Sequence, residues 1–289
     1  MSTAKLLPLL LAGLLASPLV RADGASDLHA RYGQSTQRLH DSPFHRPLYL
    51  ESQEESGKLQ GEVYAEIEHP FAQVQQVLSD PQRWCEVLLL QPNVKQCRAL
   101  EGGSKLAVNL GRRFDQPIEK TYAAEFTFHP PQKQSDYFAV QLDAAKGPVG
   151  THDYRIAVEA MPVGSKTFLH LAYAYGYGMT ARLATQAYFS TSGSGKVGFT
   201  VAGKSEDGTP AYVTGLRGAV ERNAMRYYLA IEAHLAVADT PQPQRFEQSL
   251  QRWFDSIEQY ARQLKEDDRN AYVTVKRGEY QRQQQAQQG

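Results

Sequence analysis

Apolar and polar positions along the chain follow two periods, and residues 61–90 show both. In residues 61–68 apolar side chains occupy every second position, which is the period of a half-buried strand. Residues 71–78 instead repeat their apolar side chains at helical spacing. Asp80 followed by Pro81 is typical of a helix start, so a second helix is expected directly after the first. The pattern therefore predicts one strand followed by two short helices.

Residues 94–177 return to alternation and predict six more strands. Glycine and proline pairs separate the alternating segments, which favours short connections between neighbouring strands. Strands joined in this way form an antiparallel meander. The last segment carries a tyrosine at every second position from residue 173 to residue 177.

The rest of the chain is mainly helical in pattern. Residues 178–210 are mixed, with a short helix expected at 180–188 and a short strand at 197–201. A long amphipathic helix is predicted for residues 211–238, and another amphipathic helix follows after Pro243. The polar, glutamine-rich tail from Asp267 is expected to be a solvated helix or disordered. The apolar stripe of the long helix consists of Val213, Leu216, Val220, Ala224, Tyr227, Ile231 and Leu235.

The N-terminus is expected to be absent from the mature protein. Lys5 precedes an apolar, uncharged stretch from Leu6 to Val20, and Ala22 completes a motif that suits signal peptidase. The stretch is shorter than the roughly 20 residues of a membrane span. We therefore expect residues 1–22 to be a cleaved secretory signal and the protein to be periplasmic or secreted. Residues 23–60 are polar without a clear period, and we expect an irregular arm there.

Charge and cysteine content narrow the function classes. Without residues 1–22 the chain carries 29 basic and 31 acidic side chains, a balance that suggests neither a nucleic-acid partner nor electrostatic membrane docking. The only cysteines are Cys85 and Cys97, and an even number in an exported protein favours a disulfide between them. Two cysteines without a nearby histidine make a poor metal site. We expect no metal and no cofactor.

The order of these elements resembles the START-like superfamily, which is also called helix-grip, SRPBCC or birch-pollen-allergen-like. The resemblance covers residues 61–238 and depends on three features: the passage through His69-Pro70-Phe71, the stretch from Asp80 to Trp84, and the apolar helix Val213–Leu235. It implies an α+β fold in which a curved antiparallel sheet of seven strands wraps round a long helix. Residues 239–289 would add a C-terminal helical extension. The chain is also similar to exported bacterial members of this group, which implies a periplasmic setting.

The resemblance also implies a ligand site, because in helix-grip proteins a cavity lies between the sheet and the long helix. Tyrosines on one face of the last strand would line this cavity, although ordinary packing or outward exposure remain alternatives. The charged stretch 217–227 fits either a polar anchor for a ligand or, as we favour, pairing with the sheet rim or with residues 178–210. The candidate cavity residues are Tyr122, Phe126, Tyr154, Tyr173, Tyr175, Tyr177, Leu216, Val220, Asn223, Tyr227 and Ile231.

Three functions from different classes stay open. The first is a monomeric, non-enzymatic binding or carrier protein for a lipid or another hydrophobic small molecule. The second is a cyclase or aromatase-type enzyme, which needs converging acid–base groups; only His152, His170 and the tyrosines offer them, and we assign no catalytic residue. The third is an interaction protein that docks on a membrane or an envelope protein, for which the extra C-terminal helix is the candidate. Fold alone does not decide among these functions.

Overall fold

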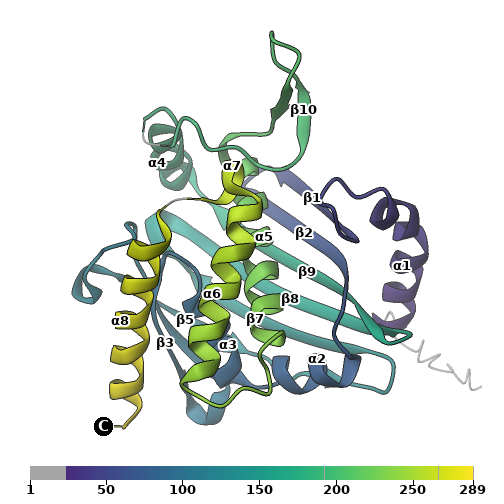
Figure 1. Cartoon of the computed structure of the whole chain (residues 1–289). Coiled ribbons are helices and arrows are strands. Elements are labelled where there is room, and N and C mark those ends of the chain that lie inside the picture. Colours follow the sequence, from purple (N-terminus) through teal and green to yellow (C-terminus); the bar gives the residue numbers. More distant parts are fainter. Residues whose placement is uncertain (1–23, 192, 266, 289) are drawn as a thin grey trace, which may run out of the picture.

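A computed structural model describes residues 24–191, 193–265 and 267–288, and it shows one large antiparallel sheet with helices on both faces (Figure 1). The expected signal sequence, residues 1–22, lies outside the described residues. Within these ranges the main sheet has nine strands in the order β1-β2-β9-β8-β7-β5-β4-β3, with β6 paired to β7. Its strands are β1 (Leu48–Glu55), β2 (Lys58–Ile67), β3 (Val94–Leu100), β4 (Lys105–Leu110), β5 (Tyr122–Phe128), β6 (Gln132–Lys133), β7 (Phe138–Lys146), β8 (Thr151–Val163) and β9 (Lys166–Tyr177).

Most helices cover one face of the sheet, which we call the inner face. The long helix α5 packs mainly on β1, β2 and β9, and α3 and α8 pack on β3. A single helix, α1 (Gly24–His40), covers part of the opposite, outer face. The other helices are α2 (Phe71–Leu78), α3 (Pro81–Leu89), α4 (Met179–Phe189), α5 (Gly215–Leu235), α6 (Gln244–Gln259), α7 (Ala261–Leu264) and α8 (Arg269–Gln288). No helix in the part of the chain that the structure describes is long and apolar enough to cross a bilayer.

This arrangement confirms the expected helix-grip class. The first strand of the predicted domain, β2, pairs with the last meander strand, β9, so that Val63 lies opposite Leu171. Both side chains belong to the core that α5 covers. The contact between sheet and helix is close at Gly61, where an added Cβ would lie 3.0 Å from the Val220 carbonyl oxygen. On the β2 side, the sheet is therefore in direct contact with the helix.

The predicted N-terminal boundary of the folded domain is wrong. Residues 23–60 are not an irregular arm, because they form α1 and the strand β1, which pairs with β2 along its whole length. With β6, this brings the sheet to nine strands rather than seven. The helix α1 is stabilised by Leu28 and Leu39, which are buried against the outer face beside Tyr64 and Phe168. This tertiary contact overrides a local sequence that is mostly polar.

The C-terminal tail is also more ordered than expected. Residues 269–288 form α8, which packs on α6 and on the sheet edge at β3. Its buried side chains include Tyr272, Lys276, Glu279 and Gln283. The tail is thus a docked part of the fold rather than a solvated extension.

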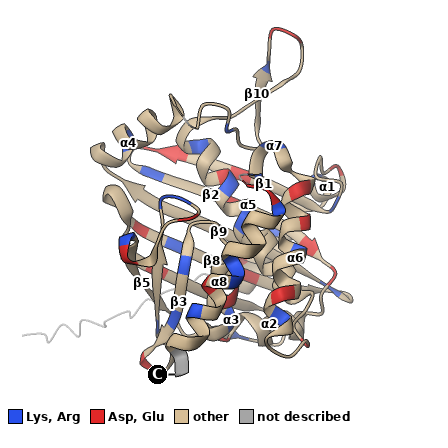
Figure 2. Ribbon diagram, turned by 60° about the vertical axis from the view of Figure 1, so that its left-hand side comes forward, with Lys and Arg blue, Asp and Glu red and all other residues tan. Residues whose placement is uncertain are grey.

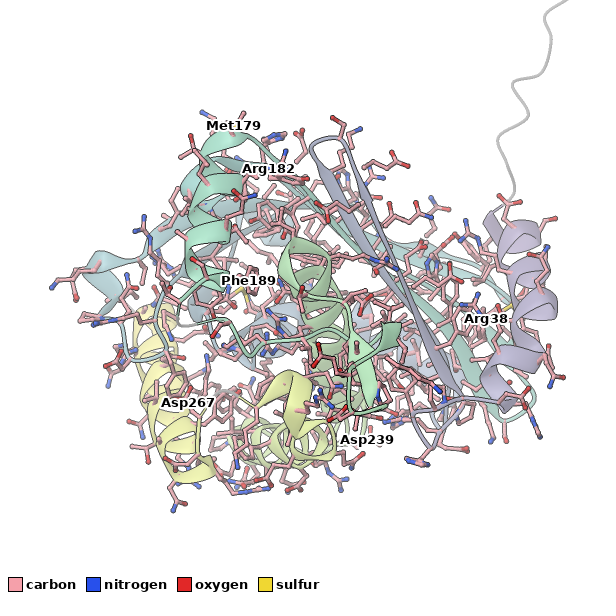
Figure 3. The ribbon with its side chains drawn as sticks, turned by 90° about the horizontal axis from the view of Figure 1, so that it is seen from above. Arg38, Met179, Arg182, Phe189, Asp239 and Asp267 are labelled. Carbon is pink, nitrogen blue, oxygen red and sulfur yellow. A yellow bond between two sulfur atoms is a disulfide. The ribbon has the colours of Figure 1, made fainter. Side chains whose placement is uncertain are left out.

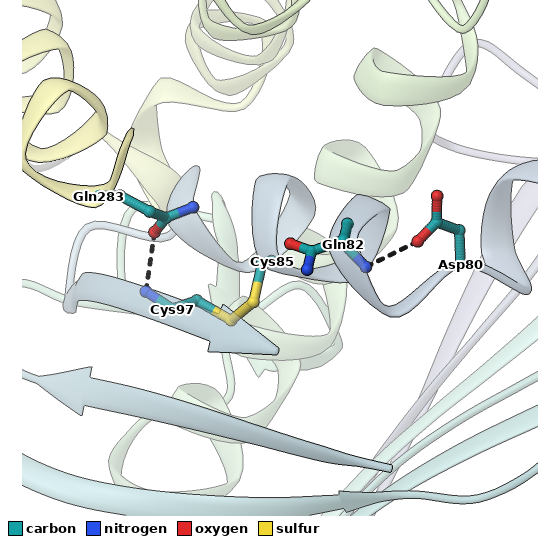
Figure 4. The surroundings of a disulfide bond; sticks show 5 residues. All are labelled: Asp80, Gln82, Cys85, Cys97 and Gln283. Atoms are coloured by element: carbon teal, nitrogen blue, oxygen red, sulfur yellow. Dashed lines mark hydrogen bonds between the residues drawn. A yellow bond between two sulfur atoms is a disulfide. The ribbon is translucent and has the colours of Figure 1, made fainter. Parts of the chain in front are cut away.

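Two local predictions near the second helix are confirmed (Figure 4). Asp80 caps α3, because its side chain accepts a hydrogen bond from the Gln82 backbone N–H at 2.8 Å. Cys85 and Cys97 form a disulfide with their Cα atoms 5.1 Å apart. The Cys97 backbone N–H also donates to Gln283 Oε1 at 2.8 Å. The disulfide and α8 therefore hold β3 from two sides.

The segment between β9 and α5 begins with the expected short helix, α4. The expected strand at 197–201 is displaced, because β10 (Val201–Lys204) shares only Val201 with it and pairs with β11 (Pro210–Tyr212). This hairpin projects from the molecule beyond the N-terminal end of α5 (Figure 1).

Candidate functional site: a tyrosine cluster under α5

The tyrosines of β9 point to the inner face of the sheet, so the structure decides the question of facing that the sequence left open. Tyr173 and Tyr175 are buried in the same core as Leu169 and Leu171. Phe168, on the other parity, packs against α1 on the outer face. The period of two along β9 therefore places the tyrosine side chains beneath α5.

Five aromatic side chains meet in this region, and we call them the tyrosine cluster: Phe126 from β5, Tyr154 from β8, Tyr173 and Tyr175 from β9, and Tyr227 from α5. Tyr154 stacks on Tyr175 with ring centroids 5.3 Å apart, and Tyr173 lies 5.1 Å from Tyr227. Phe126 meets Tyr154 edge-on at 6.4 Å. These rings contact one another between α5 and the sheet, where the resemblance to helix-grip proteins implied a cavity.

The hydroxyl groups of the cluster differ in their hydrogen bonding. Tyr154 donates to Thr151 Oγ1 at 2.8 Å, and Tyr173 has the Asn223 side chain as a polar neighbour. Among the described residues, the hydroxyls of Tyr175 and Tyr227 have no hydrogen-bond partner. Burial raises the pKa of Tyr173, Tyr175 and Tyr227 well above the ordinary value. All three hydroxyls therefore remain protonated donors at neutral pH.

One side of the cluster reaches the surface. Tyr122 lies next to Tyr154 and is 36% exposed. Leu216 and Asn223 are half-buried on the same face of α5 as Tyr227. By contrast, the other two candidate residues on α5, Val220 and Ile231, are fully buried in the packed core. The structure therefore separates the candidate residues into packed ones and accessible ones.

Two hollows lie near the cluster, and the sheet separates the first of them from it. One, of about 980 Å³, lies over the outer face and includes Tyr154 and Tyr175 in its lining. The other, of about 710 Å³, lies at the end of β1 and is bordered by Tyr177, Arg182 and Arg217. Half-buried Tyr177 donates to Glu54 Oε1 at 3.1 Å in this second hollow. Polar and charged side chains therefore border both hollows, while the cluster itself is aromatic.

The charged stretch of α5 takes the structural role that we favoured. Glu221 is fully buried and accepts hydrogen bonds from the Thr200 backbone N–H at 2.9 Å and from the Thr200 hydroxyl at 2.7 Å. Arg217 donates to the Ser52 hydroxyl at 2.8 Å, and Arg226 donates to the Leu264 carbonyl at 3.1 Å. These side chains fasten α5 to β1, to the 178–210 segment and to α7.

Neither candidate histidine faces the cluster. His170 lies on the outer face of β9, stacked on Tyr64 with ring centroids 4.4 Å apart. His152 lies over Gly176 on the same outer face and hydrogen-bonds to Asp153 at 2.8 Å. A register shift in β8 between His152 and Arg155 produces this placement. The tyrosine hydroxyls and the Asn223 amide are therefore the polar groups of the cluster that the described residues provide.

Comparison with known proteins finds similarity in structure but not in sequence. No protein-family model matches the chain, and no curated protein sequence matches it. Solved structures that resemble it include a truncated norcoclaurine synthase from Thalictrum flavum, with 12% identity over 49% of this chain and 90% of that chain, and a TM-score of 0.34. Another is Ara h 8.0201, with 11% identity over 62% of this chain and 99% of that chain, and a TM-score of 0.38.

A START superfamily protein from Mycobacterium smegmatis is also similar, with 14% identity over 44% of this chain and 88% of that chain, and a TM-score of 0.30. The strand order and the position of α5 establish the helix-grip class of this chain.

Proposed function

We propose that the protein is an exported binding or carrier protein for a hydrophobic small molecule that carries a hydrogen-bond acceptor, such as the carboxyl group of a fatty acid. The observation that carries this proposal is the pair of hydroxyls on Tyr175 and Tyr227, which have no protein partner among the described residues although their side chains are buried in an aromatic cluster. A ligand acceptor that reaches these hydroxyls would receive their hydrogen bonds without breaking any bond inside the protein. Such a hydrogen bond is typically worth about 0.5–1.5 kcal/mol net.

The rest of the cluster suits the apolar part of such a ligand. Burial of apolar area contributes about 25 cal/mol per Å², and the rings of Phe126 and Tyr154 offer such a surface. Tyr122 and Leu216 on the accessible side provide the route of entry. Because the rings contact one another, binding requires them to move apart, and a tyrosine ring moves by rotation about only two bonds.

An enzyme of the cyclase or aromatase type is the weaker alternative. General acid–base catalysis needs a group with a pKa near the operating pH. The pKa values of the buried cluster tyrosines are raised instead, and His152 and His170 face outward. The geometry therefore favours binding over catalysis.

Two fluorescent probes test the proposal: cis-parinaric acid, which has a carboxylate, and N-phenyl-1-naphthylamine, which has none. We expect the protein to bind both probes. The double variant Tyr175→Phe/Tyr227→Phe should lose at least ~tenfold affinity for parinaric acid, because hydrogen bonds to a charged acceptor are worth about 1.5–3 kcal/mol each. Its affinity for the naphthylamine should be nearly unchanged, since the rings remain.

The matched control is Tyr154→Phe, which removes a hydroxyl of the same cluster that already has a protein partner in Thr151. This variant should bind both probes almost as the wild type does. If the wild type binds neither probe, or if all three hydroxyl removals act alike, the proposed site is wrong.

A further inference from the structure

The helix α4 presents an apolar face to solvent. Met179, Leu183 and Ala187 follow one another at intervals of four residues, which places them on the same side of the helix. Met179 is 71% exposed and Leu183 is 58% exposed. Ala181, on the opposite side, is the buried residue of the helix. A helix of a water-soluble protein normally shows the reverse pattern, with its apolar face inward.

Another exposed apolar residue lies beside this helix. Val149 occupies the tip of the turn between β7 and β8, and it has the left-handed backbone angles φ 59° and ψ 29°. This conformation is strained for a β-branched residue. The turn contacts α4, because a Cβ added at Gly150 would lie 3.8 Å from the Cβ of Thr180. Val149 is 37% exposed, and together with Met179, Leu183 and Ala187 it forms what we call the α4 surface.

The segments that build the α4 surface are basic and lack acids. Residues 144–152 and 178–204 contain Lys146, Arg182, Lys196 and Lys204 and no aspartate or glutamate. Figure 2 shows α4 as largely uncharged. Glu54 and Glu55 line a hollow together with Arg182, so the attraction for an anion should come mainly from the lysines. This local charge contrasts with the slightly acidic balance of the whole mature chain.

The other side of α4 leads to the tyrosine cluster. Phe189 lies on the side of α4 nearer to α5, while Met179 lies at its outer end (Figure 3). The guanidinium group of Arg222 on α5 is 5.7 Å from the centre of the Phe189 ring. The same guanidinium group acts electrostatically on Tyr175, and Arg182 of α4 acts in the same way on Tyr177. The helix that carries the α4 surface therefore packs beside α5, close to the proposed ligand site.

We propose that the α4 surface docks on a bilayer that contains anionic lipids, so that the bound molecule passes between membrane and cluster next to the membrane. The chemistry fits this partner, because exposed aliphatic side chains insert into the acyl boundary while flanking lysines meet the head groups. The proposal rests on the proposed binding function, since it states where the ligand is taken up and delivered. The α4 surface differs from the C-terminal helix, which was the docking candidate suggested by the sequence.

Flotation of the purified protein with vesicles tests the proposal. Vesicles of phosphatidylethanolamine mixed with phosphatidylglycerol should bind the protein, and vesicles of phosphatidylcholine alone should bind it more weakly. The double variant Met179→Glu/Leu183→Glu should weaken binding at least ~tenfold, because it replaces two inserting side chains by charges. The double variant Lys146→Gln/Lys196→Gln should weaken binding to the anionic vesicles roughly tenfold and leave binding to phosphatidylcholine unchanged.

Leu100→Glu is the matched control, because Leu100 is an exposed leucine at the end of β3, outside the α4 surface. It should bind vesicles as the wild type does.

Each variant is also tested with parinaric acid in solution. A variant that keeps probe binding and loses vesicle binding supports the docking surface. If the wild type does not bind parinaric acid, the proposed binding function is wrong, whatever the result with vesicles. The docking proposal is overturned if the wild type does not bind anionic vesicles, or if the Met179→Glu/Leu183→Glu variant binds them as strongly as the wild type does. It is also overturned if sedimentation shows a dimer that this variant dissociates.

Discussion

His170 shows how a single polar residue connects three strands on the outer face. Its ring lies between two carboxylates, with Nδ1 2.9 Å from Glu159 on β8 and Nε2 3.1 Å from Glu62 on β2. Burial disfavours the charged imidazole, but the hydrogen bonds to Glu159 and Glu62 outweigh it and raise the pKa of His170. Burial likewise opposes ionisation of the two carboxyl groups, and hydrogen bonding to His170 nevertheless lowers the pKa of each.

These opposite shifts define a pH window for stability. Because the pKa of His170 is raised by folding, its contribution is complete below the unfolded value of about 6.5 and is lost as the pH rises through the folded value. The contribution of the carboxylates is present above their unfolded pKa values and is lost as the pH falls through the lowered ones. The arrangement therefore stabilises the fold most in mildly acidic solution.

The variant His170→Gln should lower the free energy of unfolding by about 1–3 kcal/mol at mildly acidic pH, since it removes two charge-assisted hydrogen bonds. The difference from the wild type should shrink as the pH rises through the pKa of folded His170. Urea unfolding at several pH values measures it. His129→Gln serves as the control, because His129 pairs with Asp143 at a more exposed position. A difference that does not depend on pH would show that His170 is uncharged in the fold.

At the scale of elements, α8 is held to the edge of the sheet by a buried polar network. Lys276 Nζ donates to the carbonyls of Gln91 at 2.6 Å and Val94 at 2.8 Å, and to Glu279 at 2.7 Å. Lys95 Nζ lies 3.2 Å from the same carboxylate. Burial lowers the pKa of Lys276 to about 8, although the Glu279 carboxylate opposes this shift. One carboxylate therefore balances two buried lysines.

Removal of that carboxylate should be costly. We expect Glu279→Gln to lower the free energy of unfolding by about 3–5 kcal/mol, because Lys95 and Lys276 would lose their shared counter-charge in the interior. The matched control is Glu247→Gln, which breaks the exposed pair with Arg277 and should cost less than about 1 kcal/mol. Chemical denaturation of both variants gives the comparison. Equal effects would mean that the buried network contributes no more than a surface pair.

The same network explains why α8 was not predicted as a docked helix. Its buried residues Tyr272, Lys276, Glu279 and Gln283 are spaced as one helical face. Three of the four are long polar side chains, which look like a solvated face when only hydrophobicity is considered. The spacing with Tyr272 was the available signal. The sequence alone does not show that backbone groups in and just before β3 form hydrogen bonds with these side chains.

For the whole molecule, the order of the helices and strands was predictable, because most of them follow from local periodicity and turn residues. The disulfide and the Asp80 cap were also predictable, since each follows from a compartment argument or from a neighbouring residue. The interior beneath α5 was not, because it depends on how closely the helix approaches the sheet. Gly61 permits contact at β2, and the large rings of Tyr173 and Tyr227 set the spacing further across. The candidate residues could be named in advance, but how they pack beneath α5 could not.

That packing leads to a final prediction. It compares Tyr227 and Ile231, which the sequence analysis placed on the same apolar stripe of the long helix. Ile231 is 1% exposed and lies in the solid core, so Ile231→Ala should cost about 2–5 kcal/mol through the cavity it leaves. Tyr227 has an unpartnered hydroxyl and neighbours in a cluster that reaches the surface. After truncation of Tyr227, the neighbouring rings of the cluster can move into the space or solvent can enter it. Tyr227→Ala should therefore lower the free energy of unfolding by less than about 2 kcal/mol, below the usual range for a large aromatic residue.

The two variants should also differ in binding. Tyr227→Ala opens volume in the cluster and removes a donor, so it should keep or gain affinity for N-phenyl-1-naphthylamine and lose affinity for parinaric acid. Ile231→Ala should change neither affinity while it remains folded. Trp84→Ala provides the reference for solid core, because Trp84 is fully buried and donates to the Leu78 carbonyl at 2.8 Å. If Tyr227→Ala destabilises the protein as much as Trp84→Ala does and leaves both probes unaffected, the tyrosine cluster is ordinary core. The binding function would then have to be sought at the hollow over the outer face.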